Sequence, residues 1–254
     1  NGKSSMKVLT TIASYSGNSN PYIKEVIGEL KQVSDVVVFS PEKINIDEVK
    51  TELRDKSLEH SLVFEPRQYI LDHLDEYDYF LYNEDDILIK AESLLYAIEV
   101  NETLIKDNIQ NNVNFLRYEL DNGVEEFVDL APYNSVHTGG NGISDIIRRA
   151  YKIFGEYYFT PWNLHSGNFL LSRRQIQTLE YNNVFPTEAK ATYCGILESG
   201  ASGFKNNLRL LTPVAGYKRL MVHHMSNKYI FNPVKITTDL MDNFFKFIPE
   251  DVPV

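Results

Sequence analysis

The segment DYFLYNEDDILI, residues 78–89, carries an apolar strand directly into the carboxylates of Glu84, Asp85 and Asp86. Neighbouring like charges repel one another, and a carboxylate beside an apolar run raises the free energy of the fold unless its charge is compensated. A bound metal ion, a cluster of cations, or exposure to water at a solvated turn would each provide that compensation. The sequence on either side of the segment helps to distinguish between them.

Short apolar strands and amphipathic helices alternate around this segment through the first part of the chain. Continuous apolar strands separated by helices are typical of a parallel sheet that is covered on both faces. We therefore expect an α/β fold with a Rossmann-like first half, which binds ligands outside the carboxyl ends of its strands. The expected strands are residues 6–15, 35–40 and 78–83, and the expected helices are residues 17–30, 66–77 and 90–107.

The pattern changes near residue 110. An Asp-Asn-Gly turn signal at residues 121–123 joins two apolar runs and predicts an antiparallel hairpin. We expect one domain with two halves, residues 6–110 and residues 111–250, of which the second carries a mixed sheet, while residues 1–5 are a cloning remnant. The second half is expected to contain strands at 113–120, 125–130, 167–172 and 208–224, helices at 173–181 and 187–199, and a glycine-rich loop at 137–144.

Composition excludes several classes of function. The chain has 254 residues and a net charge of −10, from 35 acidic and 25 basic residues, and it has no basic stripe for a nucleic-acid backbone. Cys194 is the single cysteine, which excludes an intrachain disulfide and a cysteine-rich zinc site. The sequence has no long apolar run and no signal peptide, so we expect a cytoplasmic protein without a membrane span.

A divalent metal ion is one explanation for the crowded carboxylates. Mn²⁺ and Mg²⁺ prefer carboxylate oxygens and are often shared between a few acidic side chains and the phosphates of a substrate. In an extended backbone, Glu84 and Asp86 face the same side and Asp85 faces the other. The alternative explanation is a solvated turn that happens to be acidic.

Segment 78–86 resembles the Asp-x-Asp region of nucleotide-sugar glycosyltransferases of the GT-A fold, although its triplet begins with Glu rather than Asp. The stretches HSGNFLLSRRQIQTLE (165–180) and MVHHMSNKY (221–229) are similar to later signatures of that family, in the same order. The resemblance implies that Asp86 is the first metal ligand and Glu84 the second. His224 or His223 would be the third, and only one of these two neighbours can reach the site.

The same resemblance implies a set of donor-binding residues. The polar end of the first strand would recognise the nucleotide, and Arg67 would contact the donor from the helix that precedes the metal strand. Trp162 and His165 suit a sugar, because an aromatic ring stacks on its apolar face while polar groups bind its hydroxyls. The predicted donor-binding residues are Thr11, Ala13, Ser14, Tyr15, Arg67, Asp85, Trp162, His165, Gly167 and Asn168.

An inverting member of this family also needs a carboxylate base for the acceptor hydroxyl. Two residues at about the expected spacing are Glu188, at the start of the helix expected at 187–199, and Glu198, near its end. The implied function is a glycosyltransferase that uses Mn²⁺ or Mg²⁺, takes a UDP- or GDP-sugar as donor, and transfers the sugar to a saccharide or glycan acceptor, with inversion. The resemblance also implies a mixed second half that holds the acceptor.

Two other functions remain open at this point. A sugar-nucleotide-binding module of the same fold would keep the site but lack activity. A sugar nucleotidyltransferase would share the first half, but such enzymes open with a glycine-rich loop and a basic run. The segment ASYSGNSNPY (13–22) contains one glycine and no basic residue before Lys24, which disfavours that class.

Overall fold

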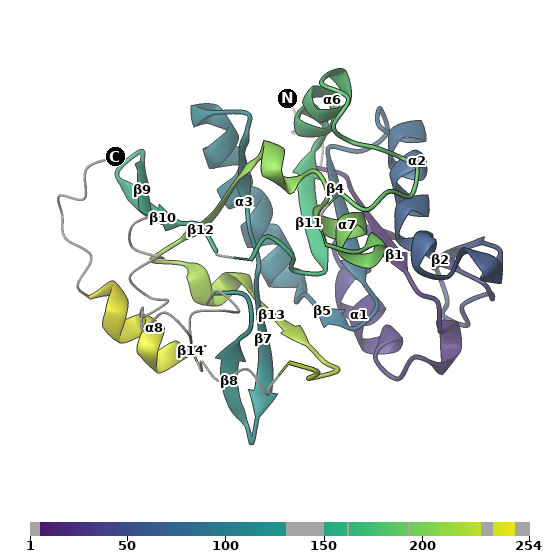
Figure 1. Cartoon of the computed structure of the whole chain (residues 1–254), viewed down its shortest axis with the longest axis horizontal. Coiled ribbons are helices and arrows are strands. Elements are labelled where there is room, and N and C mark those ends of the chain that lie inside the picture. Colours follow the sequence, from purple (N-terminus) through teal and green to yellow (C-terminus); the bar gives the residue numbers. More distant parts are fainter. Residues whose placement is uncertain (1–5, 131–149, 162, 193, 230–235, 247–254) are drawn as a thin grey trace.

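A five-stranded sheet with the strand order β11-β4-β1-β2-β3 forms the centre of the first half (Figure 1). The computed structural model describes residues 6–130, 150–161, 163–192, 194–229 and 236–246. Four strands of this sheet are parallel, and β11 pairs antiparallel with β4 at one edge. The strands are β1 (Val8–Ala13), β2 (Asp35–Ser40), β3 (Lys50–Leu53), β4 (Tyr79–Glu84) and β11 (Asn168–Ser172).

Alternation along the buried strands sends successive side chains to two separate cores. In β1, Val8 and Ile12 pack with the apolar faces of α1 (Ile23–Leu30) and α3 (Ala91–Asp107). Leu9 and Ala13 pack on the opposite face. That face is covered by α2 (Glu65–Asp72), α6 (Arg173–Tyr181), α7 (Ile196–Ser202) and the 3₁₀ segment η2 (Lys56–Phe64). The first half is thus a layered α/β structure, as the alternation of strands and helices predicted.

Two further sheets form the second half. One has the order β14-β8-β7-β13-β5 and the other has the order β6-β12-β10-β9. The first comprises β5 (Ile87–Leu88), β7 (Leu116–Asp121), β8 (Val124–Phe127), β13 (Met221–His224) and β14 (Ile236–Thr237). The second comprises β6 (Asn111–Val113), β9 (Ala150–Ile153), β10 (Glu156–Phe159) and β12 (Arg209–Pro213). Shorter elements are α8 (Thr238–Phe245) and the 3₁₀ turns η1 (Gly17–Ser19), η3 (Lys205–Asn207) and η4 (Tyr217–Leu220).

The two halves exchange strands. β11 follows residue 110 in the sequence but lies beside β4 of the first sheet, whereas β5 precedes it and pairs with β13 of the second half. Because β5 follows β4 after a turn of two residues, this exchange brings the carboxyl end of β4 against β13. The turn that contains Asp85 and Asp86 therefore lies at the junction of the two sheets.

The prediction of a helix over residues 187–199 was wrong. Residues 187–192 and 194–195 are not helical, and α7 begins at Ile196. The segment TEAKAT (187–192) has no apolar stripe to bury, and most of its residues are exposed, so no packing stabilises a helix there. The glycine-rich loop at 137–144 lies outside the described residues. Among the described helices, none combines the length and the apolar character that a membrane span requires.

Candidate functional site

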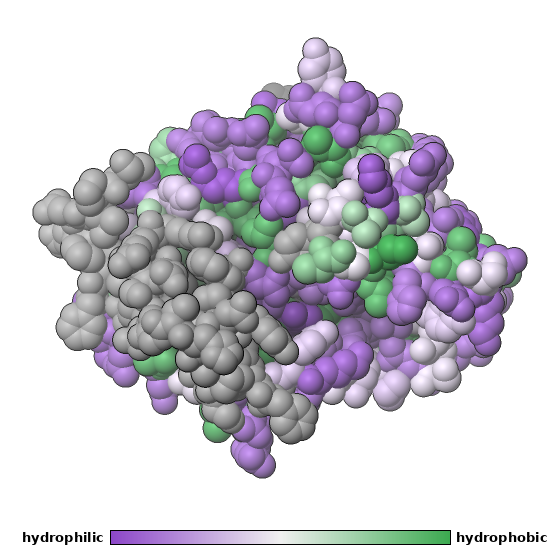
Figure 2. All heavy atoms as spheres, viewed as in Figure 1, coloured by the Kyte–Doolittle hydropathy of each residue, from purple (hydrophilic) through white to green (hydrophobic). Residues whose placement is uncertain are grey.

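A cavity of about 590 Å³ opens at the carboxyl ends of β1 and β4, against the turn of residues 84–86. Part of its lining is apolar, with Ala13, Leu62 and Val63, and the rest is mostly charged or polar. Figure 2 shows hydrophilic side chains at the centre of this face of the molecule, with hydrophobic ones beside them. The charged and polar residues that line it include Glu84, Asp85, Asp86, Arg117, His165, Glu198, His224 and Lys228.

Asp86 and His224 face each other across the junction of the sheets, with Nε2 of the imidazole 3.2 Å from Oδ2 of the carboxylate. On the other side of the ring, Nδ1 lies 2.5 Å from Oε1 of Glu119, a carboxylate on β7 that is fully buried. Burial lowers the pKa of His224, but its hydrogen bonds to the two carboxylates prevail and raise it. Burial likewise raises the pKa of Asp86, but the hydrogen bond and the charge of His224 prevail and bring it to about 2.

The turn after β13 covers this pair. The Ser226 hydroxyl lies 2.9 Å from Nε2 of His224, and the Lys228 ammonium lies 3.7 Å from Oδ2 of Asp86. The backbone N–H of Tyr229 donates to Oε2 of Glu119 at 2.7 Å, and the Tyr229 ring stacks on His224 with the centroids 5.5 Å apart. Glu119 therefore holds both the histidine and the turn that closes over it.

The structure brings only one histidine of the predicted pair to the carboxylates. His223 points to the other face of β13, where it stacks on Tyr118 with the ring centroids 5.1 Å apart and lies 3.3 Å from the Asn227 side chain. The alternation of side chains along a strand explains this separation. The placement of His223 as a metal ligand is corrected, since it does not face Asp86.

Glu84 ends β4 and is held close to Gly167. Its backbone N–H donates to the Gly167 carbonyl at 2.9 Å, and Gly167 has a positive φ of 69°. A Cβ on Gly167 would lie 2.8 Å from Oε2 of Glu84, so a side chain there would displace the Glu84 carboxylate as well as strain the backbone. Burial, together with the charge of Asp86, raises the pKa of Glu84 to about 7.

Asp85 faces the end of β1. Its Oδ2 accepts a hydrogen bond of 2.6 Å from the Ser14 hydroxyl, and burial raises the pKa of the carboxyl although the hydrogen bonds from Ser14 and Asn20 oppose this. Ala13 and the exposed Tyr15 line the cavity next to them. Thr11 does not. Its side chain is buried within the sheet and donates to the Leu81 carbonyl, so its predicted role in donor binding is corrected.

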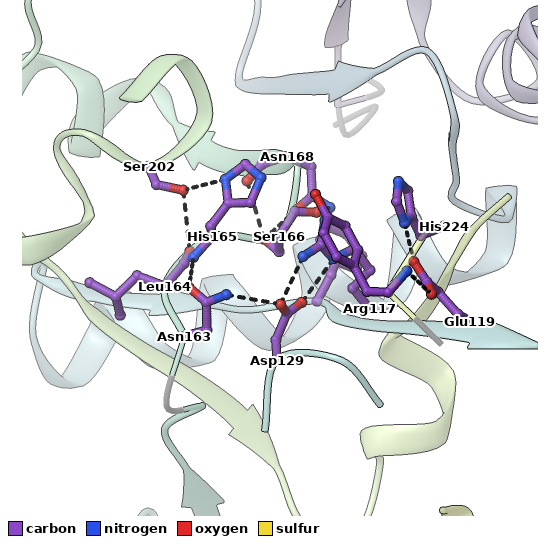
Figure 3. A network of polar contacts seen from close by, with 12 residues as sticks. Arg117, Glu119, Asp129, Asn163, Leu164, His165, Ser166, Asn168, Ser202 and His224 are labelled. Carbon is purple, nitrogen blue, oxygen red and sulfur yellow. Dashed lines mark hydrogen bonds and ion pairs between the residues drawn. The ribbon is translucent and has the colours of Figure 1, made fainter. Parts of the chain in front are cut away.

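A buried polar network lies behind the cavity (Figure 3). Arg117 binds Asp129 through two hydrogen bonds, of 3.1 and 2.9 Å, and both side chains are almost fully buried. Asn163 donates to the same carboxylate at 3.1 Å, and its Oδ1 accepts from the backbone N–H of His165 at 3.0 Å. The network therefore couples Arg117, which lines the cavity, to the loop that carries His165.

The network also sets the charge of His165. Burial, and then the positive charges of Arg117 and Lys205, lower the pKa of His165 to about 3, so its imidazole is neutral near pH 7. Its Nδ1 lies 3.2 Å from the Ser202 hydroxyl, and its Nε2 lies 4.0 Å from Oε1 of Glu84. A neutral imidazole in this position can exchange hydrogen bonds with a hydroxyl-bearing ligand.

Sequence reasoning missed Arg117 and Glu119. Both are charged residues inside LRYEL (116–120), a run expected to form a strand, and both are buried. They alternate with Leu116, Tyr118 and Leu120, and that pattern predicts a strand whose charged side chains face water, so no local signal marked them as buried. Lys205, which is buried and donates to the Leu164 carbonyl and the Ser166 hydroxyl, carries no local signal either.

Arg67 has a structural role. Its guanidinium is almost fully buried, and it donates to the carbonyls of Pro186, Ser199 and Gly200 at 2.7 to 2.8 Å. It also lies over the rings of three phenylalanines, Phe64, Phe185 and Phe204. These contacts anchor α7 and the segment before it, and Arg67 is not among the described residues that line the cavity. Its predicted contact with the donor is therefore corrected.

Of the two candidate bases, only Glu198 is among the described residues that line the cavity. Glu198, in the first turn of α7, lines the cavity, and its Oε2 accepts a hydrogen bond of 3.1 Å from the Gly195 backbone. Glu188 is exposed in a non-helical segment and is not among the described lining residues, so the helix start on which its prediction rested does not exist. Asn168 is buried at the start of β11 and bonds to Ser166. Trp162 lies outside the described residues.

The described residues contain no group of three or more His, Cys, Asp or Glu side chains arranged to hold a metal ion. Asp86 and His224 nevertheless supply an oxygen and a nitrogen that face each other, and Glu119 fixes the imidazole from behind. Such a carboxylate partner on the distal ring nitrogen commonly orients a metal-binding histidine. The donor set therefore fits a site with two protein ligands that leaves other positions to phosphate oxygens and water.

Comparison with known protein families and with curated proteins found nothing that matches this chain.

Proposed function

We propose that the protein is a metal-dependent glycosyltransferase of the GT-A type, which transfers a sugar from a nucleotide diphosphate donor to a saccharide or glycan acceptor. One observation carries this proposal. Asp86, in the turn at the carboxyl end of a parallel strand, lies 3.2 Å from His224 of a distant strand, and both residues line a cavity of about 590 Å³. Ligands of open α/β sheets bind at this edge, and the cavity has the volume of a small-molecule site.

Asp86 and His224 would hold Mn²⁺ or Mg²⁺, with Glu84 near enough to contribute directly or through water. When bound, the metal ion would neutralise the charge that develops on the diphosphate leaving group. Lys228 reaches Asp86 at 3.7 Å with an exposed ammonium, and Arg117 lines the same cavity. These two cations would supply further positive charge to the phosphates in a protein that is otherwise acidic.

The residues at the end of β1 and those near Gly167 would contact different parts of the donor. Ala13 and Tyr15 would contact the base, and Asp85, held by Ser14 at 2.6 Å, would accept hydrogen bonds from the ribose. On the other side, the neutral His165 would bind the transferred sugar next to Gly167. This arrangement suits a ribonucleotide donor, because the ribose hydroxyls need the acceptor that Asp85 provides, and the proposed donor is a UDP- or GDP-sugar.

Glu198 is the base that this proposal assigns to the acceptor hydroxyl. It lies on α7 at the edge of the cavity, near the apolar Leu197. A carboxylate in this position would take the proton from the acceptor hydroxyl while the acceptor oxygen bonds to the anomeric carbon and the bond to the diphosphate on the opposite face breaks, which inverts that carbon. The stereochemistry is tested directly by NMR of the product at early times.

Calorimetric titration with UDP, GDP and CMP, each with and without Mn²⁺, tests the proposal on the wild type and on Asp86→Ala. We expect one nucleotide to bind in a metal-dependent manner and to lose that dependence in the variant. Binding that is indifferent to both the metal and Asp86 would refute the assignment. Metal-dependent binding without donor hydrolysis or transfer would instead identify a sugar-nucleotide-binding module of the same fold.

A further inference from the structure

A second polar cavity system lies away from the candidate site. Two cavities, of about 270 and 350 Å³, share Gln110, Asn207 and Leu208 and so form one groove. The groove lies between α6, the carboxyl end of α3 and the turn η3. Figure 1 shows α6 and α3 near the upper edge of the molecule. We call this groove the amide groove, because its described lining includes the amide side chains of Asn108, Gln110, Asn111, Gln175, Asn182, Asn206 and Asn207.

The described lining of the amide groove is almost uncharged. Of its lining residues that the structure describes, Arg209 alone is charged, although charged residues make up 24% of the chain. The Arg209 guanidinium lies over the Tyr151 ring, 4.8 Å from its centroid. A groove with a single cation cannot select a phosphate or a polyanion, which needs several positive charges. Carboxamides donate and accept hydrogen bonds without charge, as sugar hydroxyls do.

Asn111 provides independent evidence for a ligand. Its side chain is fully buried and lines the groove, and its Nδ2 donates to Oδ2 of Asp107 at 2.8 Å and to the Leu104 carbonyl at 3.3 Å. These two acceptors define which side-chain atom is the nitrogen. Its Oδ1 has no hydrogen-bond partner among the described residues. A buried amide oxygen without a donor is costly, and a hydroxyl that enters the groove would provide that donor once the side chains that bury the oxygen shift to admit it.

The floor of the amide groove is rigid. Gln175, which is buried on α6, donates to the Asn111 carbonyl at 2.9 Å, and its Oε1 accepts from Asn101 at 2.8 Å. Beside Asn182, at the end of α6, Tyr181 exposes 87% of its surface. An exposed aromatic ring next to neutral hydrogen-bonding groups offers a stacking surface for the apolar face of a sugar ring.

We propose that the amide groove is a second binding site for a neutral saccharide, separate from the cavity at Asp86 and His224. Its exposed amides bind sugar hydroxyls, Oδ1 of Asn111 accepts one of them, and Tyr181 stacks on the adjoining residue of the glycan. None of its residues lines the candidate site, so this proposal does not depend on the proposed function.

The test is titration of the ¹⁵N-labelled protein with neutral hexasaccharides of glucose (α1,4 and β1,4), of mannose and of N-acetylglucosamine, followed by NMR. The variant combines Gln110→Ala, Asn182→Ala and Asn206→Ala, which all change exposed side chains. Gln32→Ala, which changes an exposed amide just after α1, is the matched control. Asp86→Ala reports on the other site, and urea unfolding checks that each variant is folded.

We expect one of these oligosaccharides to shift side-chain amide resonances of the groove in the wild type, in Gln32→Ala and in Asp86→Ala. The triple variant should bind it at least about tenfold more weakly, because each lost hydrogen bond weakens binding about threefold or more. The proposal is overturned if none of the hexasaccharides shifts these resonances, or if the triple variant binds as the wild type does. Loss of all binding in Asp86→Ala would also overturn it, since the saccharide would then occupy the other cavity.

Discussion

The Oε1 atom of Glu119 lies 2.5 Å from Nδ1 of His224, and Nε2 of the same ring lies 3.2 Å from Oδ2 of Asp86. Glu119 comes from β7, a strand that pairs parallel with the strand of His224. A fully buried carboxylate thus orients the histidine toward the turn that follows β4. The proposed metal site therefore depends on Glu119, which is not among the described residues that line the cavity.

Glu119→Gln is expected to weaken Mn²⁺ binding about tenfold or more, because the neutral amide no longer fixes the imidazole tautomer. The measurement is calorimetric titration with Mn²⁺ in the presence of the nucleotide that binds. Glu25→Gln, at an exposed position of α1, is the control and should bind as the wild type does. Equal affinity in Glu119→Gln would contradict the orienting role of Glu119.

Glu198→Gln should lower the rate of sugar transfer about 10²- to 10⁴-fold, which is the usual contribution of a general base. Nucleotide affinity should remain unchanged, since the substitution keeps the shape of the side chain and the hydrogen bond from Gly195. Glu188→Gln is the matched control and should retain full activity, because Glu188 is exposed outside the cavity. Loss of activity in Glu188→Gln alone would reverse the two assignments.

Gly167→Ala and Gly155→Ala separate the cost of backbone conformation from the cost of a collision. Both glycines have a positive φ, of 69° and 87°, so each substitution should destabilise the fold by about 1 kcal/mol. Only at Gly167 would the added Cβ meet Glu84, since nothing lies within 4 Å of it at Gly155. We expect weaker nucleotide binding in Gly167→Ala alone, measured by titration beside urea unfolding. Equal binding in the two variants would argue against a role for the position of Glu84.

Arg67→Met should destabilise the protein by about 3 kcal/mol or more, because it leaves three buried carbonyls without their charged donor. Arg174→Met, at an exposed position of α6, should change the free energy of unfolding by less than about 0.5 kcal/mol. Urea unfolding measures both. If Arg67→Met kept the wild-type stability but bound the nucleotide more weakly, Arg67 would have to contact the donor, contrary to the role assigned here.

We expect the buried Lys205 to make the free energy of unfolding depend on pH. Burial lowers the pKa of its ammonium to about 7, although the charge of Asp129 opposes this. Between pH 7 and the ordinary pKa of a lysine, the unfolded chain binds a proton that the folded protein has released, so stability rises with pH in this range. The contribution is at most about 1.4 kcal/mol per pH unit.

Urea unfolding of the wild type and of Lys205→Met between pH 6.5 and pH 9.5 measures this contribution as a difference in slope. The variant should be less stable overall, since it loses the hydrogen bonds to Leu164 and Ser166, but its stability should rise less steeply with pH. Arg174→Met should keep the wild-type slope. Parallel slopes for the wild type and Lys205→Met would show that Lys205 titrates near its ordinary pKa.

Local pattern was enough to predict much of the first half. The strands at residues 35–40 and 78–83 were predicted within about one residue of β2 and β4, and α3 was predicted at nearly its full length. Each of these elements buries a regular apolar pattern, so the period of that pattern is visible in the sequence. Segment 187–199 lacks such a pattern, and there the prediction of a helix was wrong.

The sequence by itself determined that carboxylates end a buried strand of an α/β fold, because that depends only on residues that are neighbours in the chain. The tertiary structure decided which distant groups meet them. It turned His224 rather than His223 toward Asp86, placed Glu119 behind it, and used Arg67 to anchor α7. These roles follow from which strands pair and in what register, and strand pairing between distant segments leaves no local signal in the sequence.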